Sequence, residues 1–254
     1  MSHPRINQKT AVQLLQDSFN RVVETQQPNI AAAAELIVQA LGRDGVIQVV
    51  GTGHSRSFAM EMAGRAGGLV PASRLAISDL VFFGDAAPLD ILDPLLERDA
   101  TLAARLLDVH DLNPADIFVI CSNSGGNGST VELARLVKER GHALIVVTSM
   151  EHTRAIDSRH PSGQKLYELA DVVIDNGGVL GDATLQLPTG GAITATSTLT
   201  GSLIAQMLVT EICGLLLEQE QQVPVLLSAN IPGGDEHNDE LLVRYGDRIK
   251  TAAP

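Results

Sequence analysis

The sequence predicts an α/β protein in which helices cover both faces of a parallel sheet. Short β-branched runs recur along the chain, and they are too continuously apolar for strands with one face in water. The runs alternate with loops and stretches of helical character. Because neighbouring parallel strands need a crossover, usually a helix, this alternation favours a buried parallel sheet with right-handed connections.

The individual elements follow from local pattern. The expected strands are short and apolar: Val46–Val50, Ile117–Cys121, Ala143–Thr148 and Val172–Ile174. The expected helices show apolar residues at helical spacing or helix-forming composition: Gln8–Gln26, Asn29–Leu41, Arg56–Ala66, Val131–Arg140, Ala195–Gln219 and Asp235–Ile249. Residues 71–114 carry little periodic signal apart from a candidate helix at Asp99–Leu107. We expect this stretch to cover a site or an interface.

Composition limits the classes of partner. Hydrophobic residues make up 44% of the chain, which is ample for a packed core. The net charge of -12 comes without a Lys/Arg cluster, so nucleic acid is not expected as a partner. A small anion can still be held locally by backbone N–H groups, hydroxyls and a helix N-terminus. Cys121 and Cys213 have neither the spacing nor the setting of a metal site or a disulfide.

The expected location is the cytoplasm, with no membrane partner. Residues 1–7 contain no apolar stretch preceded by positive charge, so no secretory signal is expected. The one membrane-like run, Leu199–Leu217, is interrupted by Gln206, Thr210 and Glu211. Such a pattern is more typical of a helix buried inside a soluble protein.

A polar loop, Ser122–Thr130, follows the strand predicted at Ile117–Cys121. It combines four hydroxyls, two amides and three glycines directly before a helix. Glycine allows close backbone approach, hydroxyls donate to phosphoryl oxygens, and the helix N-terminus favours an anion. The loop therefore predicts a phosphate site, although turns also favour Ser, Asn and Gly, which leaves an ordinary solvated loop as the alternative.

A second loop, Gly51–Ser55, follows the first predicted strand and begins Gly-Thr-Gly. Arg56 stands where the dinucleotide fingerprint has its third glycine, and no Walker sequence occurs in the chain. Dinucleotides and nucleoside triphosphates are therefore disfavoured.

Together the two loops resemble those of the sugar isomerase domain (SIS) family, whose members carry Gly-x-Gly-x-Ser after the first strand and Ser-x-Ser-Gly after a later one. The resemblance covers roughly residues 29–219. Ser-Asn-Ser-Gly at 122–125 and Asn-Ile-Pro-Gly-Gly-Asp-Glu-His-Asn at 230–238 are most similar to the family's stand-alone phosphosugar-binding branch. The family's isomerases continue with a short Gly-x-Thr, whereas here the stretch 126–130 is longer, which leaves open which hydroxyl replaces that threonine.

The resemblance implies a three-layer, flavodoxin-like parallel sheet with extra N- and C-terminal helices, all within one SIS domain over residues 1–254. Residues 1–45 would form a helical dimerisation segment, 46–220 the phosphosugar-binding core and 221–254 a C-terminal segment. The implied ligand is a sugar phosphate, bound in a homodimer near the subunit interface. Neither a metal nor another cofactor is implied.

The candidate substrate-binding residues come from both loops. The resemblance puts Ser122 and Ser124 at the phosphosugar and the first loop around the sugar, and the remaining polar residues of the second loop complete the set. The candidates are Gly53, His54, Ser55, Ser122, Asn123, Ser124, Asn127 and Ser129.

Glu61 is the first candidate for a catalytic base. SIS enzymes move protons next to a sugar carbonyl, which requires a base for the C2 proton. Glu61 lies near the first loop among largely apolar neighbours, where a partly desolvated carboxylate suits proton abstraction. The alternative is a surface glutamate paired with Arg65 at i, i+4. Glu132 and Glu211 are weaker candidates, since the first would oppose a bound anion and the second lies in an apolar helix.

His237 is the second catalytic candidate, because it follows a glycine pair at the start of a polar helix. Imidazole suits ring opening and proton shuttling near neutral pH. Related family members bring a histidine from near the chain end into the partner subunit's site, so the resemblance implies that His237 acts across a dimer. An exposed histidine beside an Asp235 helix cap is the alternative.

Two reactions and one non-catalytic role remain open. Removal of the C2 proton followed by loss of a C3 substituent is a lyase reaction, and return of the proton to C1 is aldose–ketose isomerisation. If the substrate carries an N-acetyl group at C2, the ketose is not an available product. The stand-alone architecture and the long, acidic insertion at 71–114 lead us to expect a dehydratase acting on N-acetylglucosamine 6-phosphate. The same domain also serves in regulators as a sugar-phosphate sensor, but the N-terminal helices here lack a basic recognition helix.

Overall fold

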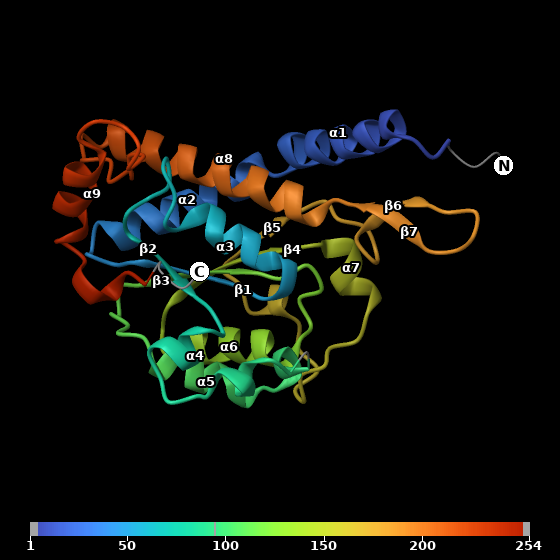
Figure 1. Cartoon of the computed structure of the whole chain (residues 1–254), viewed down its shortest axis with the longest axis horizontal. Helices are drawn as coiled ribbons and strands as arrows, with labels where there is room; N and C mark the ends of the chain where they lie inside the picture. Colours follow the sequence, from blue (N-terminus) through green and yellow to red (C-terminus); the bar gives the residue numbers. More distant parts are fainter. Residues whose placement is uncertain (1–4, 94, 251–254) are drawn as a thin grey trace.

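Five parallel strands form the centre of the structure, a computed structural model that describes residues 5–93 and 95–250 (Figure 1). The strands are β1 (Ile47–Gly51), β2 (Ala72–Leu75), β3 (Ile117–Cys121), β4 (Ala143–Thr148) and β5 (Val172–Asp175). Their order is β2-β1-β3-β4-β5, and each neighbouring pair is parallel. This is the doubly wound order of flavodoxin-like folds, so the predicted fold class is confirmed.

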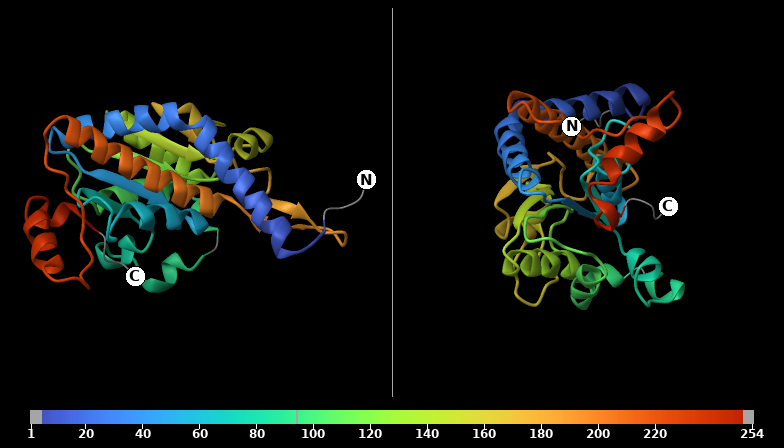
Figure 2. Two further views of the ribbon diagram at one scale, coloured as in Figure 1. Left: turned by 90° about the horizontal axis from the view of Figure 1, so that it is seen from above. Right: turned by 90° about the vertical axis from the view of Figure 1, so that its left-hand side faces the viewer.

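Helices cover both faces of this sheet (Figures 1 and 2). One layer holds α2 (Gln27–Leu41), α3 (Arg56–Met62) and α8 (Ser197–Glu218), with α1 (Gln8–Thr25) packed beside them. The opposite layer holds α5 (Thr101–Asp108) and α6 (Gly128–Glu139). Because successive side chains of a strand point to opposite faces, each central strand contributes to both layers.

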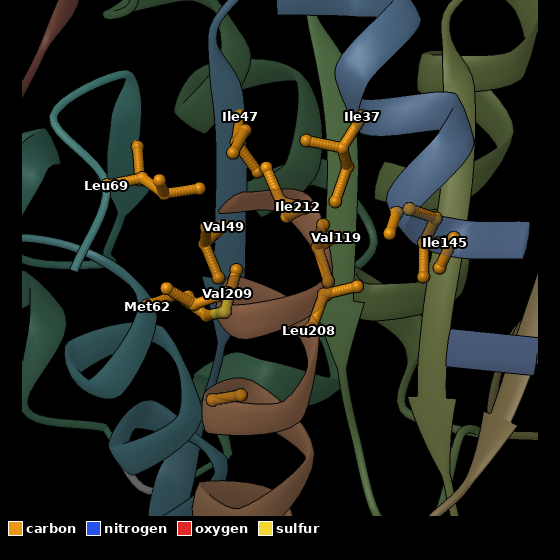
Figure 3. Close-up of a cluster of buried hydrophobic side chains, with 14 of the residues drawn as sticks. Ile37, Ile47, Val49, Met62, Leu69, Val119, Ile145, Leu208, Val209 and Ile212 are labelled. Atoms are coloured by element: carbon orange, nitrogen blue, oxygen red, sulfur yellow. The ribbon is translucent and has the colours of Figure 1, made fainter. Parts of the chain in front are cut away.

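The two faces of β3 illustrate this division of the core. Val119 packs with Ile47, Leu208 and Ile212 between the sheet and the α2, α3 and α8 layer (Figure 3). Phe118, its sequence neighbour, packs on the other side against α5 and α6. Strands buried on both faces explain why the sequence shows continuous apolar runs rather than alternation.

Helix α8 alone among the described helices is long and apolar enough to cross a membrane. In this structure Ile204, Ala205, Leu208 and Ile212 of α8 are buried in the core beside the sheet. Helix α8 is therefore a helix of the protein core, as the polar residues Gln206, Thr210 and Glu211 within its apolar sequence indicated.

Strand β2 was not predicted. It lies within the aperiodic stretch 71–114, and Ser73 and Arg74 interrupt its apolar character. It forms the edge of the sheet, where Ala72 pairs with Ile47 of β1 and the backbone N–H of Arg74 donates to the carbonyl of Lys250. This strand is therefore defined by its pairing with β1 and by its contact with the C-terminal segment, and not by a local sequence pattern.

A two-stranded antiparallel hairpin, β6 (Ala183–Gln186) and β7 (Ala192–Ala195), was also not predicted. It extends beyond the sheet beside α1 (Figure 2). Gly190 and Gly191 turn the chain with φ of 92° and 80°, a region that glycine enters without steric cost.

Two predicted helices are shorter than expected. Helix α3 ends at Met62 rather than Ala66, because Ala63 is extended and Gly64 has a φ of 78°. Helix α9 (Gly234–Leu242) ends well before Ile249 and is followed by a separate 3₁₀ turn. Short helices α4 (Asp79–Phe82) and α7 (Met150–Ala155) were also not predicted.

Candidate functional site

The candidate site lies where the order of the sheet reverses. From β1 the chain leaves toward β2, and from β3 it leaves in the other direction toward β4, so a crevice opens between the loops that follow β1 and β3. A cleft of about 420 Å³ occupies this position. Seven of the eight predicted substrate-binding residues line it: Gly53, His54, Ser55, Ser122, Asn123, Ser124 and Asn127.

The loop after β1 depends on two glycines. A β-carbon on Gly51 would stand 2.2 Å from the carbonyl oxygen of Ser55, so only glycine allows the chain to fold back here. Gly53 has a φ of 54°, in the left-handed region. The resulting 3₁₀ turn, η1 (Gly53–Ser55), brings His54 and Ser55 to the cleft.

The loop after β3 is fixed by its own hydroxyl and by a buried amide. The backbone N–H of Gly125 donates to Oγ of Ser122 over 3.2 Å, and Gly125 has a φ of 56°. Asn176, buried beside the loop, donates from Nδ2 to Oδ1 of Asn123 over 3.0 Å. These contacts hold the loop in one conformation before any ligand binds.

Helix α6 begins at Gly128, inside the stretch predicted as loop, because Asn127 is extended and starts the helix. Ser129 and Thr130 therefore belong to the first helical turn. The side-chain hydroxyl of Ser129 donates to the carbonyl of Glu97 over 2.7 Å, and Ser129 does not line the cleft. The structure thus separates Ser129 from the seven candidates that it brings together.

Glu61 lies on α3, outside the residues that line the cleft. Its Oε1 accepts hydrogen bonds from Arg65, four residues later, and from Gln206 of α8. This ion pair between Glu61 and Arg65 is the alternative that the i, i+4 spacing of the two residues allowed. A catalytic role for Glu61 stays a prediction.

His237 lies on α9 at the other end of the sheet, in the same chain. Its Nε2 is 3.0 Å from the carbonyl oxygen of Val225, and it lines a separate pocket with Arg244 and Tyr245. Tyr245 packs on Val46, just before the start of β1, so this pocket faces away from the carboxyl ends of the strands. His237 could reach a cleft only in another subunit, and that role stays a prediction.

Several cleft residues were missed by sequence analysis: Glu97, His152, Asp182, Ser197 and Thr198. The carboxylate of Asp182 accepts from the backbone N–H of Ser197 over 2.9 Å and from its hydroxyl over 2.7 Å. Asp182 therefore caps the start of α8 and has a φ of 68°, which aspartate tolerates better than most residues. The β6–β7 hairpin separates Asp182 from α8 in the sequence, so local pattern gave no signal for this contact.

Cys121 lies at the end of β3, under the cleft. Burial raises the pKa of its thiol to about 12, although a hydrogen bond with Ser55 acts in the opposite direction. The thiol therefore stays protonated at neutral pH, which makes it unsuited to nucleophilic chemistry. Within residues 5–93 and 95–250, no group of three or more His, Cys, Asp or Glu side chains is arranged to hold a metal ion.

The fold and the site define a doubly wound α/β domain with a polar cleft at its switch point, and comparison with known proteins identifies the family. The model of the SIS domain matches residues 12–149, more than half of the chain, so the protein belongs to the SIS domain family. It is 36% identical over 238 residues to a UPF0309 protein of Geobacillus kaustophilus, covering 93% of each chain. A UPF0309 protein of Listeria monocytogenes is 38% identical over 230 residues, covering 89% of this chain and 92% of the relative. The predicted family is confirmed.

Solved structures share the fold at lower identity. Phosphoheptose isomerase GmhA from Neisseria gonorrhoeae matches with a TM-score of 0.55 and 19% identity, over 80% of this chain and 95% of that one. A putative phosphosugar isomerase involved in capsule formation from Bacteroides fragilis matches with a TM-score of 0.53 and 20% identity, over 85% and 93% of the two chains.

Proposed function

We propose that this protein is an enzyme that binds an amino-sugar phosphate in the cleft and removes its C2 proton. The observation that carries the proposal is the pair of polar loops facing each other across the switch point of the sheet. One loop supplies Ser122 and Ser124, and the other supplies His54 and Ser55. The arrangement offers hydroxyl donors for a phosphate at one side and polar groups for a sugar at the other.

The first turn of α6 supports the assignment of the phosphate. This helix begins immediately after the loop, and no side chain among the described residues caps it. The backbone N–H groups of its first turn and the helix dipole favour an anion. Local donors of this kind are effective even though the whole chain carries a net charge of -12. The names of two structural relatives, phosphoheptose isomerase and putative phosphosugar isomerase, agree with a sugar-phosphate ligand.

The reaction that we favour is dehydration of N-acetylglucosamine 6-phosphate. In the open-chain form a base takes the C2 proton, the C3–O bond breaks, a C2=C3 double bond forms, and one water leaves. Aldose–ketose isomerisation begins with the same proton transfer and is the second candidate. Glu61 and His237 are our candidate acid–base groups, with His237 supplied by a partner subunit.

Dehydration has a direct test. The purified protein should convert N-acetylglucosamine 6-phosphate into a product lighter by one water, with new ultraviolet absorbance from the conjugated enal. Mass spectrometry and absorbance at matched times measure both changes. N-acetylglucosamine without phosphate is the control and should remain unchanged, whereas absence of water loss from the phosphate ester would contradict the lyase assignment.

A sensor that binds without turnover is favoured by one observation. Glu61 is hydrogen-bonded to Arg65 and Gln206, and His237 is distant from the cleft of its own chain. A sensor would bind sugar phosphates in calorimetry, yet it would leave both the substrate and its C2 proton unchanged.

We also propose a homodimer. Helix α1 exposes Val12 and Val23, and it contacts a hairpin that exposes Ile193. Apolar side chains grouped on a projecting unit are typical of an interface. Sedimentation should give twice the chain mass of 26.8 kDa, and a monomer at micromolar concentration would contradict the dimer.

A further inference from the structure

Glu97 brings a carboxylate into the cleft from a part of the chain with no predicted site residue. It lies in the 3₁₀ turn η3 (Leu96–Arg98), between β2 and α5, and it lines the cleft. Its Oε2 accepts a hydrogen bond from Nδ2 of Asn127 over 3.1 Å. Its Oε1 faces the other loop, 3.5 Å from where a β-carbon would stand on Gly53. Within the described part of the chain, Oε1 has no hydrogen-bond donor.

Residues 126–130 fix the position of Glu97. This is the stretch that is longer here than the short Gly-x-Thr of the family's isomerases. Ser129 donates from Oγ to the carbonyl of Glu97 over 2.7 Å. A β-carbon on Gly128 would stand 2.3 Å from the carbonyl oxygen of Arg98, so glycine lets η3 pack directly on the start of α6. The longer loop therefore positions a turn and its carboxylate.

Asn127 is held in turn by Arg159, whose Nη1 donates to Oδ1 of Asn127 over 2.8 Å. This contact orients the asparagine amide so that its N–H groups face Glu97. Oε2 of Glu97 is thereby held by Asn127, while Oε1 faces the cleft. A proton acceptor needs this arrangement, a fixed carboxylate with one accessible oxygen.

Two other carboxylates, those of Asp182 and Glu61, lack this combination of features. Asp182 uses both oxygens at the start of α8, where Ser197 donates to each of them. Glu61 accepts from Arg65 and Gln206 through the same oxygen and does not line the cleft. Glu97 differs from both because it combines a cleft position with an oxygen that has no donor in the described structure.

We propose that Glu97, in place of Glu61, is the catalytic residue that takes the C2 proton of the sugar phosphate, an inference that rests on the proposed function and reassigns its base. Oε1 accepts the proton, and the electron pair of the former C2–H bond forms the C2=C3 double bond as the C3–O bond breaks. Glu97 returns the proton to the departing hydroxyl, which leaves as water. The carboxylate is regenerated, and no co-reactant is required.

Loss of the C2–H signal of the sugar phosphate, followed by proton NMR in deuterium oxide, tests this role whichever product forms, because elimination and isomerisation both remove that proton from C2. Glutamine at 97 keeps an acceptor for Asn127 but cannot take a proton. Glu97→Gln should therefore lower the rate of C2–H loss and kcat by about 10²–10⁴-fold, with an unchanged dissociation constant for the sugar phosphate. Glu97→Asp, which keeps a carboxylate, should recover part of the rate. Glu139→Gln, at the exposed far end of α6, is the matched control and should behave like the wild type.

The outcomes separate the two proposals. Slow C2–H loss in Glu97→Gln with binding retained supports Glu97 as the base. A normal rate of C2–H loss in Glu97→Gln overturns the Glu97 assignment and leaves the proposed function intact, and its decrease in Glu61→Gln would then point to Glu61. Loss of binding in Glu97→Gln also overturns the Glu97 assignment, because it indicates a positioning role. A wild-type protein that binds sugar phosphates without losing the C2–H signal overturns both proposals.

Discussion

Replacing Gly51 with alanine should abolish sugar-phosphate binding and lower the free energy of unfolding by about 1–3 kcal/mol. The added β-carbon would stand 2.2 Å from the carbonyl oxygen of Ser55 and 2.7 Å from its carbonyl carbon. These are backbone atoms, so no side-chain rotation relieves the clash. The turn that carries Gly53, His54 and Ser55 into the cleft has to move as a unit.

Urea denaturation and calorimetric titration measure the two effects of Gly51→Ala. The control is Gly214→Ala, since a β-carbon on Gly214 of α8 meets nothing within 4 Å. Alanine in a helix interior should leave binding intact and raise stability by up to about 1 kcal/mol. Unchanged sugar-phosphate affinity in Gly51→Ala would mean that the loop after β1 does not form the binding site.

Replacing Ser122 and Ser124 together with alanine should weaken sugar-phosphate binding by at least about 100-fold. A hydrogen bond to a charged group contributes about 1.5–3 kcal/mol, so two lost hydroxyl donors correspond to about 3 kcal/mol or more. Ser122 also accepts from the N–H of Gly125 and therefore contributes to the loop conformation. The Ser124→Ala single variant separates lost phosphate contact from altered loop structure, because no hydrogen bond within the described structure depends on the Ser124 hydroxyl.

Affinity is measured by calorimetry with the sugar phosphate, and urea denaturation checks that each variant is folded. Ser202→Ala is the matched control, because that hydroxyl donates to the carbonyl of Thr198 within α8. It should bind like the wild type. Full affinity in the folded double variant would contradict a phosphate site at this loop.

The sequence was sufficient for those elements whose signal is local. Strands β1, β3 and β4 are buried on both faces, so each appears as an apolar run, and the partly buried β5 still shows the apolar run Val172–Ile174. The loop Ser122–Asn127 could be predicted as part of a site because its Ser, Asn and Gly content differs from that of the apolar strands, and in the structure it contributes to the cleft. Strand β2 escaped because Ser73 and Arg74 belong to an edge strand that the C-terminal segment covers.

The residues that sequence analysis missed depend on contacts between distant segments. Glu97 reaches the cleft because its turn packs on Gly128 and Ser129, and the stretch that contains it has no periodicity. Conversely, the apolar neighbours of Glu61 suggested a free carboxylate, but its partner Gln206 comes from α8, far along the chain. Local sequence carries no information about either packing arrangement.

The central claim is that the loop after β3 and the start of α6 bind the phosphate of a small sugar phosphate. A crystal structure with N-acetylglucosamine 6-phosphate tests it most directly. The phosphate should lie within hydrogen-bond distance of the Ser122 and Ser124 hydroxyls and of backbone N–H groups at the start of α6. A sugar phosphate bound with its phosphate outside this loop, or bound away from the β1–β3 switch point, would contradict the account.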